Sequence, residues 1–256
     1  GDDVTLQTAD HDTDEDAGGQ GEKPGEGAVE AKHAGQDVEG KAAVISGSGN
    51  VATHAAEKIL QLGGKVLTLS DSGGFIHDPD GIDQEKIDWA KRLKNERRGR
   101  ISEYADHFTN ASFHEGKRPW DVECDLALPC ATQNELNEEE ARALVANGCI
   151  AVAEGANMPT TLNGVKVFHD AQLMYGPGKA ANAGGVAVSG LEMSQNAERI
   201  SWNHDRLGQM LTELMEGIHE QCVEYGKQGD YVDYVRGANI AGFKKVADAM
   251  LAFGVM

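Results

Sequence analysis

The sequence predicts an α/β fold, built on a doubly wound, mainly parallel sheet with helices on both faces and a helical C-terminal segment. Two observations predict it. Short apolar runs alternate with amphipathic stretches in the order β-α-β-α-β-α-β, and the residues after Gly184 have mostly helical periodicity. This alternation favours parallel strands, because a crossover helix carries the chain back to the same edge of the sheet before the next strand begins.

Each element of this alternation has a local signal. A strand is expected where a short run is apolar or β-branched, and a helix where apolar residues recur three or four positions apart. Gly63 and Gly64 end the first helix. The predicted strands are residues 42–46, 66–70, 126–128, 150–153 and, as a fifth candidate, 173–175. The predicted helices are residues 51–62, 83–94, 101–108, 138–146, 206–225 and 242–253.

Charge divides the chain into two regions. The formal net charge is −19, and residues 1–40 contain 12 acidic but only 2 basic side chains. Such a segment has little apolar surface to bury. We therefore expect residues 1–35 to be an acidic, mobile lead-in and residues 36–256 to form one domain that ends in helices.

The composition argues against several classes of protein. A strong negative charge disfavours nucleic acid as a partner. No uncharged apolar run approaches the roughly 18 residues of a membrane span, and the polar start does not resemble a signal peptide. Of the four cysteines, Cys124 and Cys149 lie in apolar runs and are expected to be buried, reduced thiols, which fits a cytoplasmic protein.

No metal site is expected. Cysteines without accompanying histidines make a structural zinc site improbable. Asp12, Asp14 and Asp16 alternate as in a calcium loop, but Ala17 and Lys23 occupy the positions where such a loop needs glycine and glutamate. A solvated acidic tail is the better interpretation of this run.

A glycine-rich turn follows the first predicted strand and opens the first predicted helix. Its sequence is a GxGxxA pattern, of the kind that holds a pyrophosphate in Rossmann-like domains: Gly47, Ser48, Gly49, Asn50, Val51 and Ala52. Gly47 allows the tight turn, Gly49 lets the backbone approach a phosphate, and Ala52 lets the helix pack closely on the strand. The helix N-terminus adds free N–H groups and partial positive charge. A glycine turn without a ligand is the alternative.

Six longer motifs carry a resemblance to a known family. In this order along the chain they are GSGNVA at 47–52, PCATQN at 129–134, EGANMPTT at 154–161, GKAANAGGV at 178–186, SGLEMSQN at 189–196 and GANIAGFKKVADAM at 237–250. With them, residues 36–256 resemble the C-terminal coenzyme domain of the hexameric glutamate dehydrogenases. Enzymes of this family are homo-hexamers that use a dinucleotide coenzyme to interconvert glutamate with 2-oxoglutarate and ammonia. The resemblance implies that this chain is the coenzyme-binding part of such an enzyme.

The resemblance also implies roles for individual residues. Beside the nicotinamide and its ribose it places Ala131, Thr132, Gln133 and the neighbouring Asn134, together with Ala156, Asn157 and Asn182. On the glutamate side chain it places Val186 and Ser189, with the serine hydroxyl near the γ-carboxylate. Without the resemblance, these small residues would indicate only tight helix packing.

The choice of coenzyme rests on two opposing signals. Asp71 ends the second predicted strand, where a carboxylate favours NAD by accepting hydrogen bonds from the ribose 2′-hydroxyl. The resemblance, however, matches Ser72, Lys94 and Arg97 to residues that meet the 2′-phosphate in NADP-dependent bacterial enzymes. Lys94 and Arg97 lie in the basic segment 92–100, which would otherwise be interpreted as a solvated helix face. We expect NADP to be preferred, with NAD as the alternative.

The family's substrate domain, with its catalytic lysine and acidic proton-transfer residue, has no counterpart in this sequence. We therefore expect this chain, which is acidic and corresponds to an isolated domain, to bind coenzyme but not to turn over glutamate, and to be monomeric or weakly associated. A stand-alone nucleotide-binding module, or an engineered folding or solubility module, is the alternative. Adaptation to high salt is a weaker idea, because the excess charge is concentrated in the first 40 residues.

Overall fold

The computed structural model describes residues 38–254, so the predicted lead-in 1–35 and its acidic run lie outside the described residues. The described part contains a seven-stranded sheet in the order β4-β3-β2-β1-β5-β6-β7. Strands β2, β1, β5, β6 and β7 run parallel, whereas β3 and β4 are antiparallel to their neighbours. The strands are β1 (Ala42–Ile45), β2 (Lys65–Asp71), β3 (Gly74–His77), β4 (Ser112–Glu115), β5 (Leu126–Leu128), β6 (Ala151–Ala153) and β7 (Met174–Gly176).

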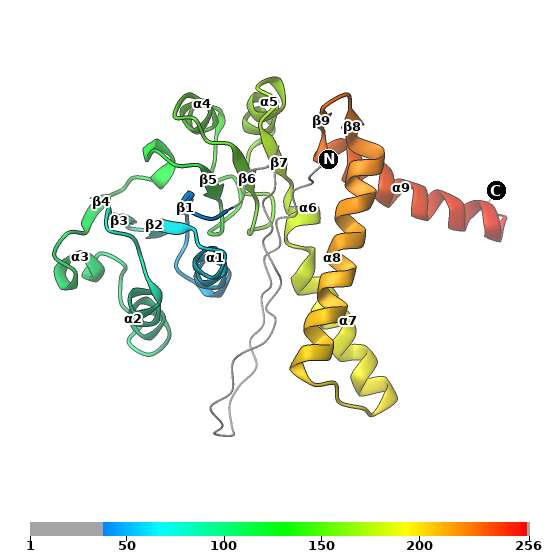
Figure 1. Ribbon diagram of the computed structural model, residues 1–256, viewed down its shortest axis with the longest axis horizontal. Coiled ribbons are helices and arrows are strands. Elements are labelled where there is room, and N and C mark those ends of the chain that lie inside the picture. The colour runs from blue at the N-terminus through cyan, green and yellow to red at the C-terminus, as the bar shows by residue number, and fades with distance from the viewer. Residues whose placement is uncertain (1–37, 255–256) are drawn as a thin grey trace.

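Helices cover both faces of this sheet, as the sequence predicts. Figure 1 shows α1 (Asn50–Gln61), α2 (Gln84–Asn95) and α3 (Glu103–His107) on one side, and α4 (Glu138–Ala146) and α5 (Leu162–Asp170) on the other. A short 3-10 turn, η1 (Pro119–Asp121), precedes β5.

Side chains alternate between the two faces along each central strand. On β1, Ala43 and Ile45 join the core under α1 and α2, while Val44 joins the core under α4 and α5. On β5, Leu126 and Leu128 likewise point opposite to Ala127. Because both faces are buried, these strands appear in the sequence as continuous apolar runs rather than as alternating patterns.

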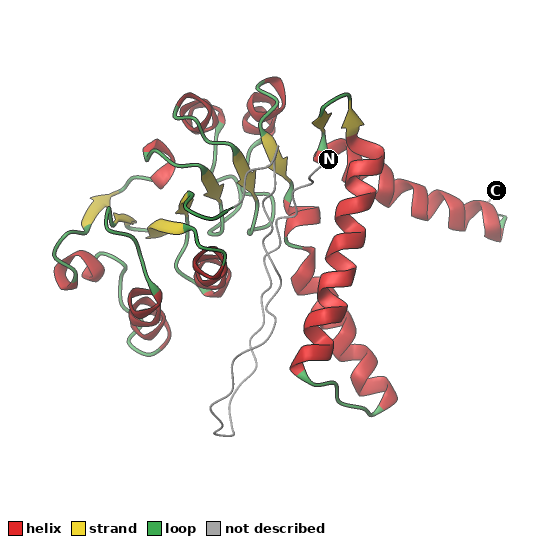
Figure 2. Cartoon of the chain, in the orientation of Figure 1, coloured by secondary structure: helices red, strands yellow, loops and turns green. Residues whose placement is uncertain are grey.

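The residues after β7 form a second, mostly helical unit, whose long helices stand beside the sheet in Figure 2. It contains α6 (Gly178–Ala181), α7 (Ala183–Glu198), α8 (His204–Gly226), the short strands β8 (Lys227–Gln228) and β9 (Tyr231–Val232), and α9 (Tyr234–Phe253). Helices α7 and α8 pack through a small core of Val188, Leu211 and Met215. Helix α9 crosses α8 near its own start and then extends away from the sheet (Figure 1).

The structure corrects several of the predicted elements. The predicted helix 101–108 is shorter, because α3 begins only at Glu103, and the predicted helix 242–253 is longer, because α9 already begins at Tyr234. Asp233 caps α9 by accepting a hydrogen bond from the N–H of Arg236 at 2.9 Å. Strands β3 and β4 and helix α5 were not predicted, and α7 was predicted only as part of the mostly helical region after Gly184.

Two glycines of α9 allow a matched test of how this helix packs. A Cβ at Gly237 would lie 2.0 Å from the Cys222 carbonyl oxygen of α8, whereas one at Gly242 would meet nothing within 4 Å. We expect Gly237→Ala to destabilise the fold by roughly 1–3 kcal/mol through overpacking. Gly242→Ala should instead stabilise it by roughly 0.5–1 kcal/mol through helix propensity. Chemical denaturation of both variants measures this, and a change of the same sign in both would contradict the expectation.

Candidate functional site

The loops that carry the predicted site residues lie at the carboxyl edge of the parallel strands. The chain leaves β1 toward β2 on one side and reaches β5 on the other, so the strand order reverses at β1. In open α/β sheets, a crevice at such a switch point is the usual ligand site. The segments that follow β1, β5 and β6 converge here. A Cβ at Gly155 would lie 2.5 Å from the Cys130 Sγ and 3.0 Å from the Val51 Cγ1.

The glycine turn after β1 is fixed by its neighbours. Gly47 has φ of +87°, and a Cβ there would lie 3.0 Å from the carbonyl oxygen of Cys130. Its N–H donates to the Ser70 Oγ at 2.7 Å, and its carbonyl accepts from the Ser70 N–H at 2.8 Å. Ser48 and Ala52 are buried. The turn therefore depends on glycine at position 47 for both conformation and space.

Gly49 has the opposite character. It is the exposed N-cap of α1, it has an extended conformation, and a Cβ there would meet nothing within 4 Å. No side chain caps this helix end. Asn50 and Val51 follow in the first turn of α1 and are half-buried. The backbone at this helix N-terminus is thus accessible to a ligand, as the GxGxxA pattern predicts.

Asp71 lies at the end of β2 and organises the loops around it. One carboxylate oxygen accepts from the Gly73 N–H at 2.9 Å, and the other accepts from the Ile101 N–H at 3.0 Å and the Lys94 ammonium at 3.1 Å. Burial raises the pKa of the Asp71 carboxyl, but these bonds from Ile101, Gly73 and Lys94 outweigh it and hold the pKa below 3.8. Asp71 is thus an ionised carboxylate with most of its acceptor capacity used within the protein.

The basic segment meets Ser72 through a residue that the sequence analysis did not single out. Arg100 donates from Nη1 to the Ser72 Oγ at 2.7 Å. Lys94 is turned toward Asp71, and Arg97 forms an exposed ion pair with Glu103 at 2.9 Å. The structure therefore gathers Ser72, Lys94 and Arg100 around the end of β2, whereas Arg97 lies beside them with a different partner.

The two motifs after β5 and β6 lie side by side. Asn134, whose φ is +54°, donates its N–H to the Met158 carbonyl at 3.0 Å. Exposed residues of the turn after β5 are Ala131, Thr132 and Gln133. The N–H groups of Ala131 and Thr132 both donate to the buried carboxylate of Glu135, at 2.9 and 3.2 Å.

Asn182 joins the loop after β6 to the start of the helical unit. Its Nδ2 donates to the carbonyl oxygens of Gly155 and Ala156 at 3.3 and 3.2 Å and to the Asn157 Oδ1 at 2.9 Å. The structure thus brings together three predicted residues, Ala156, Asn157 and Asn182. Val186 and Ser189 follow on α7, both exposed and three residues apart, so they share one face of that helix.

Sequence reasoning missed Arg100, Glu135 and Glu154 as residues that shape this edge. Glu154 is buried and accepts from the Gly178 N–H at 2.6 Å, the Thr160 N–H at 3.2 Å and the Tyr175 hydroxyl. A signal was available for Glu154, which directly follows the predicted strand 150–153 and opens the motif at 154–161, whereas Glu135 lies just after the motif at 129–134 and seven residues beyond the nearest predicted strand.

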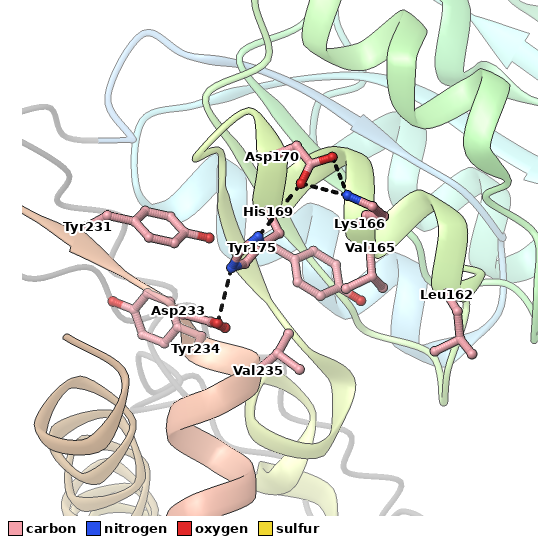
Figure 3. A pocket seen from close by; sticks show the side chains of 10 residues that line it. All are labelled: Leu162, Val165, Lys166, His169, Asp170, Tyr175, Tyr231, Asp233, Tyr234 and Val235. Carbon is pink, nitrogen blue, oxygen red and sulfur yellow. Dashed lines mark hydrogen bonds and ion pairs between the residues drawn. The ribbon is translucent and has the colours of Figure 1, made fainter. Parts of the chain in front are cut away.

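A second hollow lies at the far edge of the sheet, away from the glycine turn. It has a volume of about 390 Å³ and lies between α5, β7 and the start of α9 (Figure 3). Its polar side chains are paired with one another, Lys166 with Asp170 at 2.7 Å and His169 with Asp233 at 3.3 Å. The His169–Asp233 contact joins α5 to the start of α9, whereas Lys166 and Asp170 pair within α5.

The described residues offer neither a cluster of metal ligands nor a membrane-spanning helix. Among residues 38–254, no group of three or more His, Cys, Asp or Glu side chains could hold a metal ion. No helix in that range is long and apolar enough to cross a membrane.

Comparisons with known proteins point to one family. The glutamate/leucine/phenylalanine/valine dehydrogenase family model matches residues 24–254. The glutamate dehydrogenase of Bacteroides thetaiotaomicron is 58% identical over 88% of this chain and 51% of its own length. The NAD(P)-specific glutamate dehydrogenase of Xylanibacter ruminicola is 56% identical over 88% of this chain and 50% of its own. A solved Plasmodium falciparum glutamate dehydrogenase has a TM-score of 0.81 at 46% identity, covering 86% of this chain and 47% of that one. The chain spans about half the length of the curated relatives it matches.

The bonds around Asp71 predict how this site responds to substitution and acid. Asp71→Asn should destabilise the fold by about 1–3 kcal/mol, because buried donors lose an ionised acceptor. Amide exchange at Ile101 should accelerate. Since folding lowers the pKa of Asp71, its contribution is present above pH 3.8 and is lost as the pH falls through the lower folded-state pKa. Denaturation curves at several pH values should therefore show the two proteins converging in acid, and a difference that grew in acid would contradict this.

Proposed function

The chain belongs to the glutamate/leucine/phenylalanine/valine dehydrogenase family, and we propose that its described residues form the coenzyme-binding part of a glutamate dehydrogenase that prefers NADP. The reaction proposed for the whole enzyme is the interconversion of L-glutamate with 2-oxoglutarate and ammonia. The observation that carries the proposal is the open N-terminus of α1 behind the Gly47–Ala52 turn, at the point where the strand order reverses.

The residues present suit a dinucleotide along the whole carboxyl edge. The pyrophosphate would lie against Gly49, where the absence of a side chain leaves open space in front of the helix N-terminus. The adenosine ribose would lie beside Asp71 and Ser72, and the nicotinamide beside residues 131–133, 156–157 and Asn182. The helix N-terminus at Gly49 favours negatively charged phosphates. Basic side chains lie near Asp71 and Ser72, where they can form charge-assisted hydrogen bonds with a phosphate.

The preference for NADP rests on the groups around Ser72. Asp71 would repel a 2′-phosphate if its charge faced the ligand, but Lys94 and two backbone N–H groups already bind that carboxylate. Arg100, bound to the Ser72 hydroxyl, leaves further guanidinium donors for a phosphate. The name of the Xylanibacter ruminicola relative includes both coenzymes, so NAD is the alternative.

The described residues contribute binding and orientation to the reaction. When bound, the nicotinamide supplies the two-electron acceptor that the oxidation of an amino acid needs. Val186 and Ser189 on the exposed face of α7 would form one wall of the glutamate pocket, with the Ser189 hydroxyl meeting the γ-carboxylate. Lys179 is better assigned a structural role than proton transfer, because its ammonium donates to Asn239 of α9 and so links α6 to that helix.

A stand-alone nucleotide-binding module is the second candidate function. For such a module, the affinity for the coenzyme would not change when glutamate or 2-oxoglutarate is added. The exposed positions of Val186 and Ser189 on one face of α7 favour the dehydrogenase.

Substitution at Gly49 tests whether the turn binds the coenzyme. We expect Gly49→Val to lower NADP affinity at least tenfold, because the side chain would occupy the space in front of the helix N-terminus. The fold should persist, since the extended backbone at Gly49 suits any residue and a Cβ there meets nothing. Calorimetric titration and thermal melting measure the two effects. Unchanged affinity in a folded variant would refute the proposal.

Substitution at Arg100 tests the coenzyme preference. We expect Arg100→Ala to weaken NADP binding roughly 10- to 100-fold through loss of a charge-assisted contact of about 1.5–3 kcal/mol, and to leave NAD binding nearly unchanged. Arg97→Ala should act in the same direction. Arg142→Ala is the matched control, because it removes the same charge from α4, where Arg142 pairs with Glu138. Equal effects on NADP and NAD would contradict a role in recognising the 2′-phosphate.

A further inference from the structure

A buried carboxylate lies beneath the turn that follows β5. Glu135 is 6% exposed, and its carboxylate accepts from the N–H groups of Ala131 at 2.9 Å and Thr132 at 3.2 Å. Burial raises the pKa of this carboxyl above its ordinary value, even though the Ala131 N–H, the Ser46 hydroxyl and the Thr132 N–H all bind its ionised form. The protein therefore keeps an acidic group where burial alone disfavours its charge.

The backbone of Glu135 is also fixed by hydrogen bonds. Its backbone carbonyl accepts from the Arg118 guanidinium and from the Trp120 Nε1 at 3.3 Å. Trp120 is fully buried in the core beneath α4. Because main chain and side chain are both fixed, the carboxylate has a defined position from which it can hold the turn above it.

The same carboxylate connects this turn with the glycine turn after β1. The Ser46 hydroxyl binds Glu135, and the Ser46 Oγ also accepts from the Cys130 N–H at 2.9 Å. Ser46 directly precedes Gly47, whose backbone lies against Cys130. The segments proposed to hold the pyrophosphate and the nicotinamide are therefore joined through Ser46 and Glu135.

We infer that Glu135 is a positioning residue that sets residues 131–133 for the nicotinamide half of the coenzyme, an inference that rests on the proposed function. The carboxylate draws the N–H groups of Ala131 and Thr132 inward. At these two positions the turn offers a ligand only carbonyl oxygens and side chains, which suit ligand donors such as ribose hydroxyls and a carboxamide NH₂. Glu135 does not touch the coenzyme and acts through the turn.

Comparing a whole coenzyme with its adenosine half tests this. In the full 256-residue chain, Glu135→Ala should weaken NADP binding about tenfold or more, because two turn donors lose an ionised acceptor. The affinity for 2′,5′-ADP, which lacks the nicotinamide half, should stay within about twofold of its value in the unsubstituted chain. The contacts of this ligand lie away from residues 131–133, so the substitution should not affect them. Glu135→Gln, whose amide oxygen can still accept both N–H bonds, should restore most of the NADP affinity. Calorimetric titration gives both affinities.

Asp78→Asn is the matched control, because Asp78 is also a buried carboxylate, bound to Lys86 and Tyr104 at 2.7 Å, and lies next to the amino-terminal half of β2, away from the crevice. It should destabilise the fold without changing the ratio of the two affinities. If Glu135→Ala does not fold, Glu135→Asp, which retracts the carboxylate by one methylene, is measured instead with the same expected loss. Equal changes for NADP and 2′,5′-ADP, or none, would overturn the inference. Failure of the unsubstituted chain to bind NADP would instead overturn the proposed function.

Discussion

The close approach of two backbone segments at the carboxyl edge, Gly47 against Cys130, is the constraint on which the site depends. A Cβ at Gly47 would lie 3.0 Å from the Cys130 carbonyl, and the φ of +87° suits glycine. This contact sets where β1 ends and therefore where α1 begins. The Ser70 Oγ accepts from the Gly47 N–H and the Ser46 Oγ accepts from the Cys130 N–H, and these bonds fix the turn to β2 and to the turn after β5. The direction in which α1 presents its N-terminus follows from packing rather than from the helix itself.

Three acidic residues repeat one arrangement around this edge. Asp71 and Glu154 lie at or directly after a strand end, and Glu135 lies in the loop between β5 and α4. Each of the three accepts hydrogen bonds from two backbone N–H groups of nearby segments. Such bonds fix loop backbone without a large apolar core, which a loop beside a ligand crevice cannot have. They also turn N–H groups inward. The main exception is the start of α1, which has no side-chain cap. The anion-binding character of the edge is thereby concentrated at that one helix end.

Local patterns predicted the parallel strands and the glycine turn, because both follow from contiguous residues. The apolar runs at β1, β2, β5 and β6 fill two-sided cores, and the GxGxxA turn is a short-range motif. Strands β3 and β4 escaped prediction because their pairing is long-range: Gly74 faces Glu115 across the ladder, and β4 is half-exposed at the sheet edge. The same reason hid Arg100, whose partner Ser72 is 28 residues away. The family resemblance identified Lys94 and Arg97 as candidate phosphate-binding residues, but only the fold shows which side chains they contact.

The helical unit is joined to the sheet by polar contacts at two separate places. Asn182 and the Gly178 N–H hold its beginning to the loop after β6 and to Glu154. The His169–Asp233 pair holds the start of α9 to α5, at the far edge of the sheet. Between these places, α7 and α8 have only a small core of their own. Polar links of this kind are individually weak, with surface ion pairs contributing at most about 1 kcal/mol.

Because Asn182 adjoins both the loop 155–157 and the start of α7, any movement of α7 must change the position of Val186 and Ser189 relative to that loop. The wall proposed for the substrate and the turn proposed for the nicotinamide are therefore coupled through the Asn182 side chain and the Gly178–Glu154 hydrogen bond beside it.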